Sequence, residues 1–440
     1  MIELFTLGGY GTVGRNMTLV KYKDEAVVLD IGLHLENLIR FSGENDDIRK
    51  TESPEELMKA GALPDLIRHK TLLDKVLAII PSHAHLDHVG GVPYLYRFFR
   101  KAEIIGSPFT LAVLNELERG GRRKAASIQK IRLSVNGKHR VSRNIKVQFV
   151  SASHSVPDAV FVVVQTPDGN VVYANDFKID FSPGLGSLPN LRKLSKFRKP
   201  KALVMDSLYA GKMGKTPSES VAKEMLSDVF LQVKNQKGAI FITTFSSHIA
   251  RLKEIVEISR KCGRTPVFIG RSLFKYMTAA ESIDLVDLSS KHRIVRFNDK
   301  IVSLLRKVEQ NPEKYVVVCT GHQGEPNSVL SRIVYNRLYG FSSKDSVIFS
   351  SIVIPGEENI RNRERLELAI DKTRARVFRD IHVSGHASRE DHRELLDTLL
   401  PEKVFPAHCE LSSSKILKDF VEASYDSKVI IASEHERHAF

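Results

Sequence analysis

The feature that most constrains this chain is the heptapeptide SHAHLDH at 82–88, which directly follows the apolar run KVLAII at 75–80. Three histidines and one aspartate fall within six residues, and a single tetrahedral cation would not hold all four comfortably. In an extended segment alternate residues face the same side, so His83 and His85 can point toward one cation. We expect Asp87 and His88 to turn toward a second cation. The motif therefore predicts two divalent cations about 3.5–4 Å apart at the end of a strand.

Two cations need more ligands than this segment offers, and three further candidates follow apolar, strand-like runs. His154 comes after VQFVSAS, Asp176 ends NVVYAND, and His408 comes after KVFPA. Each of them alone would more often be a hydrogen-bonded structural residue, but beside the heptapeptide we expect each to be a metal ligand. Asp176 can lie between the cations, because a carboxylate has two oxygens and a negative charge to share.

The pattern of apolar residues changes twice along the chain. Short strands are expected near the N-terminus and at 146–176, whereas from about 217 helical spacing alternates with strand-like runs such as AIFITTF and YVVVCT. This alternation predicts a separate α/β unit with a largely parallel sheet. Strand and loop segments return at about 381. We therefore expect one domain, residues 1–206 and 382–440, interrupted by a second domain at 207–381.

A glycine run near the N-terminus, GYGTVG at 9–14, fits the GxGxxG pattern of dinucleotide sites. Such a site needs a helix to follow, whereas the next residues, MTLVKY, are typical of a strand. We interpret the run as a tight turn between strands.

The charge balance indicates a polyanionic partner. The formal net charge is +14, and residues 119–146 hold ten Lys or Arg and no carboxylate. A positive field favours phosphate backbones, although a solvated basic face is the plain alternative and charge alone separates neither RNA from DNA nor either from a membrane surface. No apolar stretch is long enough to span a membrane, and the N-terminus does not look like a signal peptide. Three widely spaced cysteines are expected to be free thiols in a cytoplasmic protein.

Taken together, these motifs resemble those of a known superfamily. HAHLDH, Asp30 in VVLDIG, His154 and Asp176 are similar to the successive motifs of the metallo-β-lactamase superfamily. Asp206 in VMDS, HVSGHAS at 382–388 and PAHCE at 406–410 are similar to the additional motifs of its β-CASP nucleases. With FSSHIAR and CTGHQGEP, the chain most resembles ribonuclease J in its short archaeal form. The resemblance implies an α/β fold, an αββα metallo-β-lactamase sandwich with an inserted β-CASP domain.

The chain departs from the bacterial members of that group after His408, where about thirty residues remain. We therefore expect it to lack their C-terminal domain. Any oligomer contact that depends on that domain is in doubt, although a homodimer is still expected.

The resemblance also implies a role for each motif residue. His386 would protonate the leaving 3′ oxygen and Asp206 would orient it, while Asp30 would orient a ligand. Zinc is the expected metal, with manganese as the alternative. One cation would be held by His83, His85 and His154, the other by Asp87, His88 and His408, with Asp176 between them.

The implied activity is hydrolysis of RNA from a 5′-monophosphate in the 5′→3′ direction, on single-stranded RNA. The 5′-monophosphate would lie in a Ser- and Gly-rich pocket, although an ordinary Ser- and Gly-rich turn is the alternative interpretation of these residues. Arg251 and Arg271 are candidates to line the groove that binds the RNA. Alternatives are an endoribonuclease of the cleavage-factor type, a DNA-processing β-CASP nuclease, an inactive RNA-binding scaffold and a small-molecule thioesterase or lactamase. The expected pocket residues are Ser246, Ser247, His248, His382, Ser384, Gly385, His386, Ala387 and Ser388.

Overall fold

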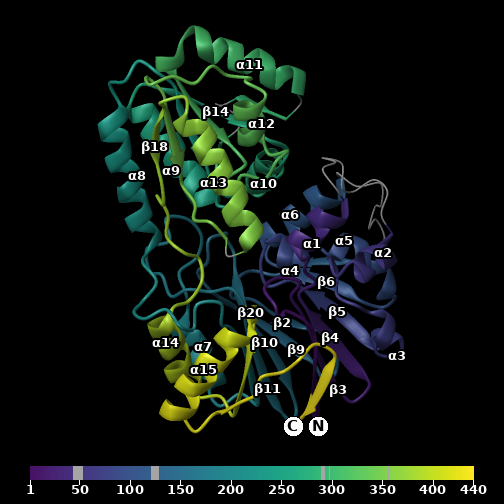
Figure 1. The fold of residues 1–440 in the computed structure, drawn as a ribbon. Helices are drawn as coiled ribbons and strands as arrows, with labels where there is room; N and C mark the ends of the chain where they lie inside the picture. Colours follow the sequence, from purple (N-terminus) through teal and green to yellow (C-terminus); the bar gives the residue numbers. More distant parts are fainter. Residues whose placement is uncertain (43–52, 120–127, 289–292, 297, 355) are drawn as a thin grey trace. The chain divides into compact units, whose positions relative to one another are not determined.

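The computed structural model describes residues 1–42, 53–119, 128–288, 293–296, 298–354 and 356–440. Within these residues the chain divides into two compact units. The first unit runs from Met1 to Pro217 and resumes at Ser384–Phe440, and the inserted unit is Ser218–Val383. The two termini lie side by side in the first unit, where β1 pairs with the last strand (Figure 1).

The first unit contains two seven-stranded sheets. Buried side chains of both sheets, for example Val27 and Ile80 from one and Val162 and Val204 from the other, form a single core cluster. In order, the first sheet is β22 (Glu436–Ala439), β1 (Ile2–Gly8), β3 (Met17–Tyr22), β4 (Glu25–Leu29), β5 (Val76–Ile80), β6 (Glu103–Gly106) and β7 (Lys130–Arg132). The second is β21 (Lys428–Val429), β19 (Lys403–Ala407), β12 (Ala202–Asp206), β11 (Gly169–Ala174), β10 (Val160–Thr166), β9 (Lys146–Ser151) and β8 (Lys138–Arg140).

Helices cover the outer faces of these sheets, which completes the αββα sandwich (Figure 1). On the second sheet, Leu194, Leu395 and Leu417 from three helices pack against the outward side chains of the strands. These helices are α7 (Leu191–Leu194), α14 (Arg389–Leu399) and α15 (Leu411–Ser424), while α1 (Leu35–Ser42), α2 (Pro54–Lys59), α3 (Lys70–Leu73), α4 (Leu86–Val89), α5 (Val92–Leu95) and α6 (Pro108–Arg119) accompany the first sheet.

The polar motif residues follow strands that run in the same direction. β11, β12 and β19 are parallel neighbours, so their carboxyl ends meet at one edge of the second sheet. β4 and β5 are likewise parallel neighbours in the first sheet. The residues just after these strand ends include Asp176 and His408 from one sheet and Asp30 and His83 from the other. This common edge is where the candidate site forms.

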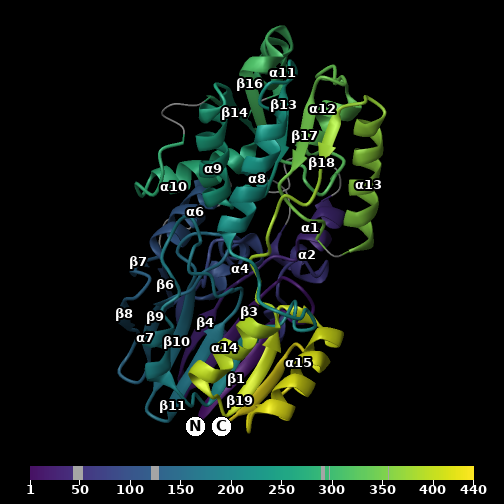
Figure 2. The same cartoon turned by 90° about the vertical axis from the view of Figure 1, so that its left-hand side faces the viewer.

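The inserted unit has one six-stranded sheet in which all the pairings are parallel, as predicted from the strand and helix alternation. Helices flank this sheet (Figure 2), and Leu305 and Leu366 from two of them pack with the strand residues Phe241 and Val317. The strands in order are β15 (Arg293–Val295), β14 (Thr265–Ile269), β16 (Tyr315–Cys319), β13 (Ile240–Thr243), β17 (Ser346–Phe349) and β18 (Arg376–Phe378). The helices are α8 (Glu219–Val233), α9 (Ile249–Lys261), α10 (Arg271–Glu281), α11 (Asn298–Gln310), α12 (Val329–Tyr335) and α13 (Glu357–Asp371).

The inserted unit differs at both ends from the predicted 207–381. Residues 207–217 pack with the first unit, because Ser207 N donates to Ala407 O at 3.0 Å and Thr216 N donates to an Asp391 carboxylate oxygen at 2.9 Å. The sequence pattern marks where helical spacing begins, but it does not reveal which domain the preceding loop packs against.

Three remaining predictions concern chemistry rather than topology. The three cysteines are free, as expected. Across the described part of the chain, no helix is both long and apolar enough to cross a membrane. The basic stretch at 119–146 falls partly outside the described residues, and its described portion forms β7, β8 and the start of β9.

Candidate metal centre

The heptapeptide leaves β5 through a bend and then enters the short helix α4. His85 stands at the N-terminus of this helix, so Asp87 and His88 turn away from His83 through a helical turn. The close contact between the backbone at residue 32 and that at residue 87 requires a glycine, because a Cβ on Gly32 would lie 1.7 Å from the carbonyl oxygen of Asp87. The geometry thus separates the four donors into two directions.

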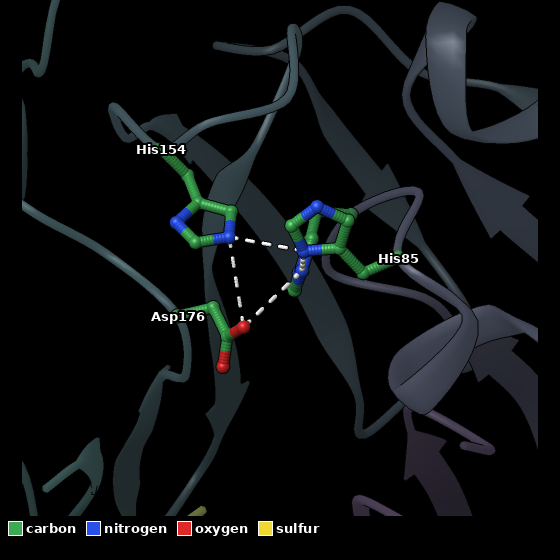
Figure 3. A group of neighbouring side chains, drawn as sticks. His85, His154 and Asp176 are labelled. Atoms are coloured by element: carbon green, nitrogen blue, oxygen red, sulfur yellow. Dashed lines mark hydrogen bonds and ion pairs between the residues drawn. The ribbon is translucent and has the colours of Figure 1, made fainter. Parts of the chain in front are cut away.

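One group of donors combines three imidazoles and a carboxylate: His83, His85, His154 and Asp176. The Nδ1 atom of His85 is 3.1 Å from the Nε2 atom of His83 and 3.1 Å from that of His154. Asp176 Oδ2 lies 3.5 Å from His83 Nε2 and 3.6 Å from His154 Nε2. Figure 3 shows His85, His154 and Asp176 pointing toward one another.

A second group shares Asp176 and adds Asp87, His88 and His408. Asp176 Oδ1 lies 3.1 Å from His88 Nε2 and 3.7 Å from His408 Nδ1. Asp87 Oδ2 lies 3.6 Å and 3.7 Å from the same two nitrogen atoms. All seven predicted ligands therefore fall into two groups joined by the two oxygens of one carboxylate.

These donors fit divalent cations. Ligand atoms about 2.0–2.1 Å from a tetrahedral zinc ion lie about 3.3 Å from one another, close to the separations of the first group. Without a cation, the three ring nitrogens meet with too few protons to link them all, and Asp176 Oδ1 is a buried oxygen with no hydrogen-bond partner. Burial and the neighbouring imidazoles hold the pKa of His85 and of His154 well below the ordinary value, which keeps both rings in the neutral form that binds metal.

The backbone is unusual at three of these positions. Asp30, Asp176 and His408 adopt left-handed φ angles of 60°, 50° and 55°. This region is sparsely occupied by residues other than glycine, and such conformations concentrate at functional sites. Asp30 and His408 directly follow a strand and Asp176 lies two residues beyond one, so the strained residue redirects the chain where the two sheets end.

Asp30 makes the contacts that an orienting role requires. Its Oδ2 atom accepts hydrogen bonds from His88 Nδ1 at 2.7 Å, Ser82 Oγ at 2.9 Å and the Tyr173 hydroxyl at 2.8 Å. The Nδ1 bond leaves His88 Nε2 directed toward Asp176 and Asp87. Ser82 and Tyr173 were not among the predicted residues, although Ser82 lies within the motif.

His386 and Asp206 form a direct pair. His386 Nδ1 donates to Asp206 Oδ2 at 2.8 Å, and His386 Nε2 faces Asp176 Oδ2 at 3.9 Å. Burial alone would lower the pKa of His386, but the carboxylates of Asp206 and Asp176 raise it to about 9. His386, Asp206 and Asp176 also form a third group of possible metal ligands. The 2.8 Å between His386 Nδ1 and Asp206 Oδ2, however, is the length of a hydrogen bond, so we interpret these two as a hydrogen-bonded pair. The arrangement favours a protonated imidazole beside the two donor groups.

Asn16 was not predicted. Its Nδ2 atom lies 3.0 Å from His88 Nε2, 2.7 Å from His408 Nδ1 and 3.1 Å from Asp87 O. It reaches this position from the glycine-rich turn, where a Cβ on Gly9 would lie 2.3 Å from Asn16 Oδ1. The glycine run was the one sequence signal for this contact. It indicates that the backbone packs closely there, but it does not indicate which residues it packs against.

Of the nine residues predicted for the phosphate pocket, five lie in the first unit and four in the inserted unit. In the first unit, Gly385 O accepts a hydrogen bond from His154 Nδ1 at 2.7 Å, and Ser384 Oγ accepts one from His386 N at 3.0 Å. Ala387 and Ser388 are buried, and the Ser388 hydroxyl lies 2.9 Å from that of Thr216. In the inserted unit, the rings of His248 and His382 lie 6.2 Å apart, and Ser246 and Ser247 directly precede His248.

The suggestion that Arg251 lines a groove is wrong. Its side chain is fully buried, and it binds the Glu219 carboxylate at 2.9 Å, Ile381 O at 2.9 Å and the Ser350 hydroxyl. A buried guanidinium needs such partners. The sequence predicts that Arg251 lies on a helix, but it does not predict that Glu219 lies opposite. Arg271 is exposed at the start of α10.

Metal uptake is expected to release protons and to strengthen as pH rises. Burial lowers the pKa of His88, yet Asp176, Asp87 and Asp30 raise it well above the ordinary value. A cation must displace this proton, so affinity should increase up to about tenfold per pH unit while His88 is protonated. Calorimetric zinc titrations in buffers of different ionisation enthalpy measure the released protons. Uptake with no proton release between pH 6 and 8 would contradict this prediction.

Comparisons with known proteins agree with the geometry. The model of the metallo-beta-lactamase superfamily matches residues 10–228, that of the Ribonuclease J beta-CASP domain matches 237–368, and that of a Zn-dependent metallo-hydrolase RNA specificity domain matches 372–432. Ribonuclease J of Pyrococcus abyssi is 38% identical over 438 residues, covering 99% of this chain and 95% of the relative. Ribonuclease J of Methanocaldococcus jannaschii is 38% identical over 411 residues, covering 92% and 91%. A crystal structure of a protein of unknown function from Enterococcus faecalis shares the fold, with a TM-score of 0.69, 18% identity and 99% of each chain covered.

Proposed function

Since the chain belongs to the ribonuclease J family of metal-dependent ribonucleases, we propose that it is a 5′→3′ exoribonuclease acting on 5′-monophosphorylated, single-stranded RNA. The observation that carries this proposal is the pair of donor groups sharing Asp176, with the His386–Asp206 pair alongside. Two divalent cations in such a site supply an activated water and neutralise charge on the attacked phosphate.

The chain's own residues would perform three tasks. The first donor group and the second would each hold one cation, with Asp176 contributing one oxygen to each. His386 would give a proton to the leaving 3′ oxygen, which an alkoxide needs in order to depart. Asp206 would hold the imidazole in orientation through the Nδ1 hydrogen bond and so keep Nε2 free for the substrate.

We assign zinc as the metal, because five of the seven donors are imidazoles, with manganese as the alternative. A homodimer also remains a prediction, which light scattering on the purified protein tests.

The 5′-monophosphate would be held by the Ser- and Gly-rich segment at 384–388 of the first unit, and the inserted unit would offer further phosphate donors in Ser246, Ser247, His248 and His382. Small residues with backbone N–H groups and hydroxyls suit a phosphate, and Gly385 already approaches His154 closely enough that a Cβ would lie 2.8 Å from its ring. A pocket for the 5′ end would make the enzyme count nucleotides from that end.

Digestion of a 5′-labelled, 5′-monophosphorylated RNA tests the direction of attack. The expected product is labelled mononucleotide from the first time point, and a 5′-triphosphate on the same RNA should slow the reaction strongly. Longer labelled fragments, or cleavage of circular RNA at a similar rate, would favour an endoribonuclease of the cleavage-factor type. Faster hydrolysis of the matched DNA strand would favour a DNA-processing enzyme, because contacts to the 2′-hydroxyl distinguish RNA.

A further inference from the structure

One edge of the first unit brings together the open ends of its two sheets. β7 is the last strand of one sheet and β8 is the last strand of the other. Leu133 and Val135 in the link between them pack on the shared core, so the strands' polar side chains are left outside. β7, β8 and α7 lie along the same side of this unit (Figure 2).

This edge carries an excess of positive charge. Residues 128–146 contain six Lys or Arg and no carboxylate. Lys130 forms an ion pair with Glu118 at 2.6 Å, and it alone of the six pairs with a carboxylate of the described residues. Arg140 stands directly opposite Lys146 in the β8–β9 pairing, and like charges in such cross-strand pairs destabilise a sheet. The following side chains are all exposed, and none forms an ion pair with a described carboxylate: Arg132, Lys138, Arg140, Arg143 and Lys146.

Two hollows lined partly by Lys and Arg adjoin these strands. One, of about 330 Å³, is lined by Asn190, Arg192, Lys193 and Lys196. Lys193 Nζ donates to Asn136 O, which joins this hollow to the β7–β8 link. The other, of about 470 Å³, is lined by three cations, Arg97, Arg100 and Lys101, together with the carboxylate of Glu103, the aromatic rings of Tyr96 and Phe99, and Ala102, Ile128 and Gln129. Gln129 directly precedes β7. We call β7, β8, the start of β9 and the two hollows the basic edge.

The basic edge connects to the candidate metal centre through β9. Asn136 Nδ2 donates to Ser151 Oγ at 3.2 Å, and Asn190 N donates to Ser151 O at 3.0 Å. Ser151 ends β9, and the metal ligand candidate His154 follows three residues later. Three residues of extended chain span at most about 10 Å. The nearer hollow therefore lies close to the candidate metal centre.

We propose that the basic edge binds the phosphate backbone of the RNA beyond the bond being hydrolysed, an inference that rests on the proposed function. Residues 128–146 contain no Phe, Tyr or Trp, so this segment offers no aromatic platform for bases. Recognition by these strands is through charge, which makes it independent of base sequence and strongly dependent on salt.

The test is the salt dependence of RNA binding to the metal-loaded protein with Lys138, Arg140 and Lys146 all changed to Gln. These side chains are exposed, so the fold should be retained, as thermal unfolding checks. The probe is a 30-nucleotide phosphorothioate RNA with a 5′-phosphate and a 3′ fluorophore, followed by anisotropy. Losing three contacts should reduce the slope of log affinity against log salt by about 2. Between 50 and 200 mM salt, wild-type affinity should then fall roughly eighteen-fold more than that of the variant.

The matched control changes three lysines elsewhere in the first unit, Lys415, Lys418 and Lys428, to Gln. This control should bind RNA with the wild-type slope. If the basic-edge variant also keeps that slope, these Lys and Arg side chains serve only to prevent another strand from pairing there, and the proposal is overturned. Binding is measured without hydrolysis, so an endonucleolytic or DNA-directed activity would refute the proposed function without affecting this result.

Discussion

Changing Asp176 to Asn is expected to reduce RNA hydrolysis by about a thousandfold or more and to lower the metal content from two ions per chain toward one. The carboxylate contributes an oxygen to each donor group, whereas an amide has one oxygen and no charge to offer. Charge stabilisation by a bound cation amounts to several kcal/mol, about three powers of ten in rate. Turnover of RNA and elemental analysis of the same preparation measure both effects.

Asn is the sharpest replacement because Asp176 has a φ of 50°, a conformation that Asn tolerates as well as Asp. Asp158 provides a matched control, since it has a φ of 57° in the same unit and belongs to neither donor group. Asp158→Asn should keep both metals and full activity. Zinc should raise the unfolding temperature of wild-type protein much more than that of Asp176→Asn. Two metals and wild-type turnover in Asp176→Asn would refute the shared-ligand model.

The donors that the structure brings together could be found from sequence because their chemistry and position are both local signals. His154, Asp176 and His408 each follow an apolar strand-like run, and such runs predict where a strand ends. Parallel neighbours then place these ends at one edge, which is a property of the sheet and not of any one residue.

Other parts of the site depend on contacts between distant segments. Asn16 contacts His88 and His408, which are 72 and 392 positions away in the sequence. No sequence pattern around residue 16 predicts those partners. Tyr173 reads as an ordinary buried strand residue, although its hydroxyl binds Asp30. Arg251 sits on a helix whose spacing is clear, but its burial against Glu219 depends on how two helices pack. Sequence periodicity predicts elements, whereas these contacts belong to their packing.

Changing His386 to Ala is expected to reduce turnover by about 10²–10⁴-fold while leaving two metals bound. The imidazole is hydrogen-bonded to Asp206 and its Nε2 lies 3.9 Å from Asp176, so it stands beside the donor groups as a proton donor would. Elemental analysis of the variant provides the check. Loss of a metal ion together with activity would show that His386 is itself a ligand in the group that it forms with Asp176 and Asp206.

The pH dependence separates a proton donor from a residue that only positions substrate. The Asp206 carboxylate helps to raise the pKa of His386 to about 9, and cations at Asp176 would draw this pKa down from that value. A general acid acts in its protonated form, so activity should fall as pH rises through the pKa of His386. Asp206→Asn removes the charge that stabilises the imidazolium, so in this variant the fall should begin at lower pH. Another group would donate the proton if the pH dependence of the rate is unchanged in Asp206→Asn and the residual rate of His386→Ala still falls at high pH.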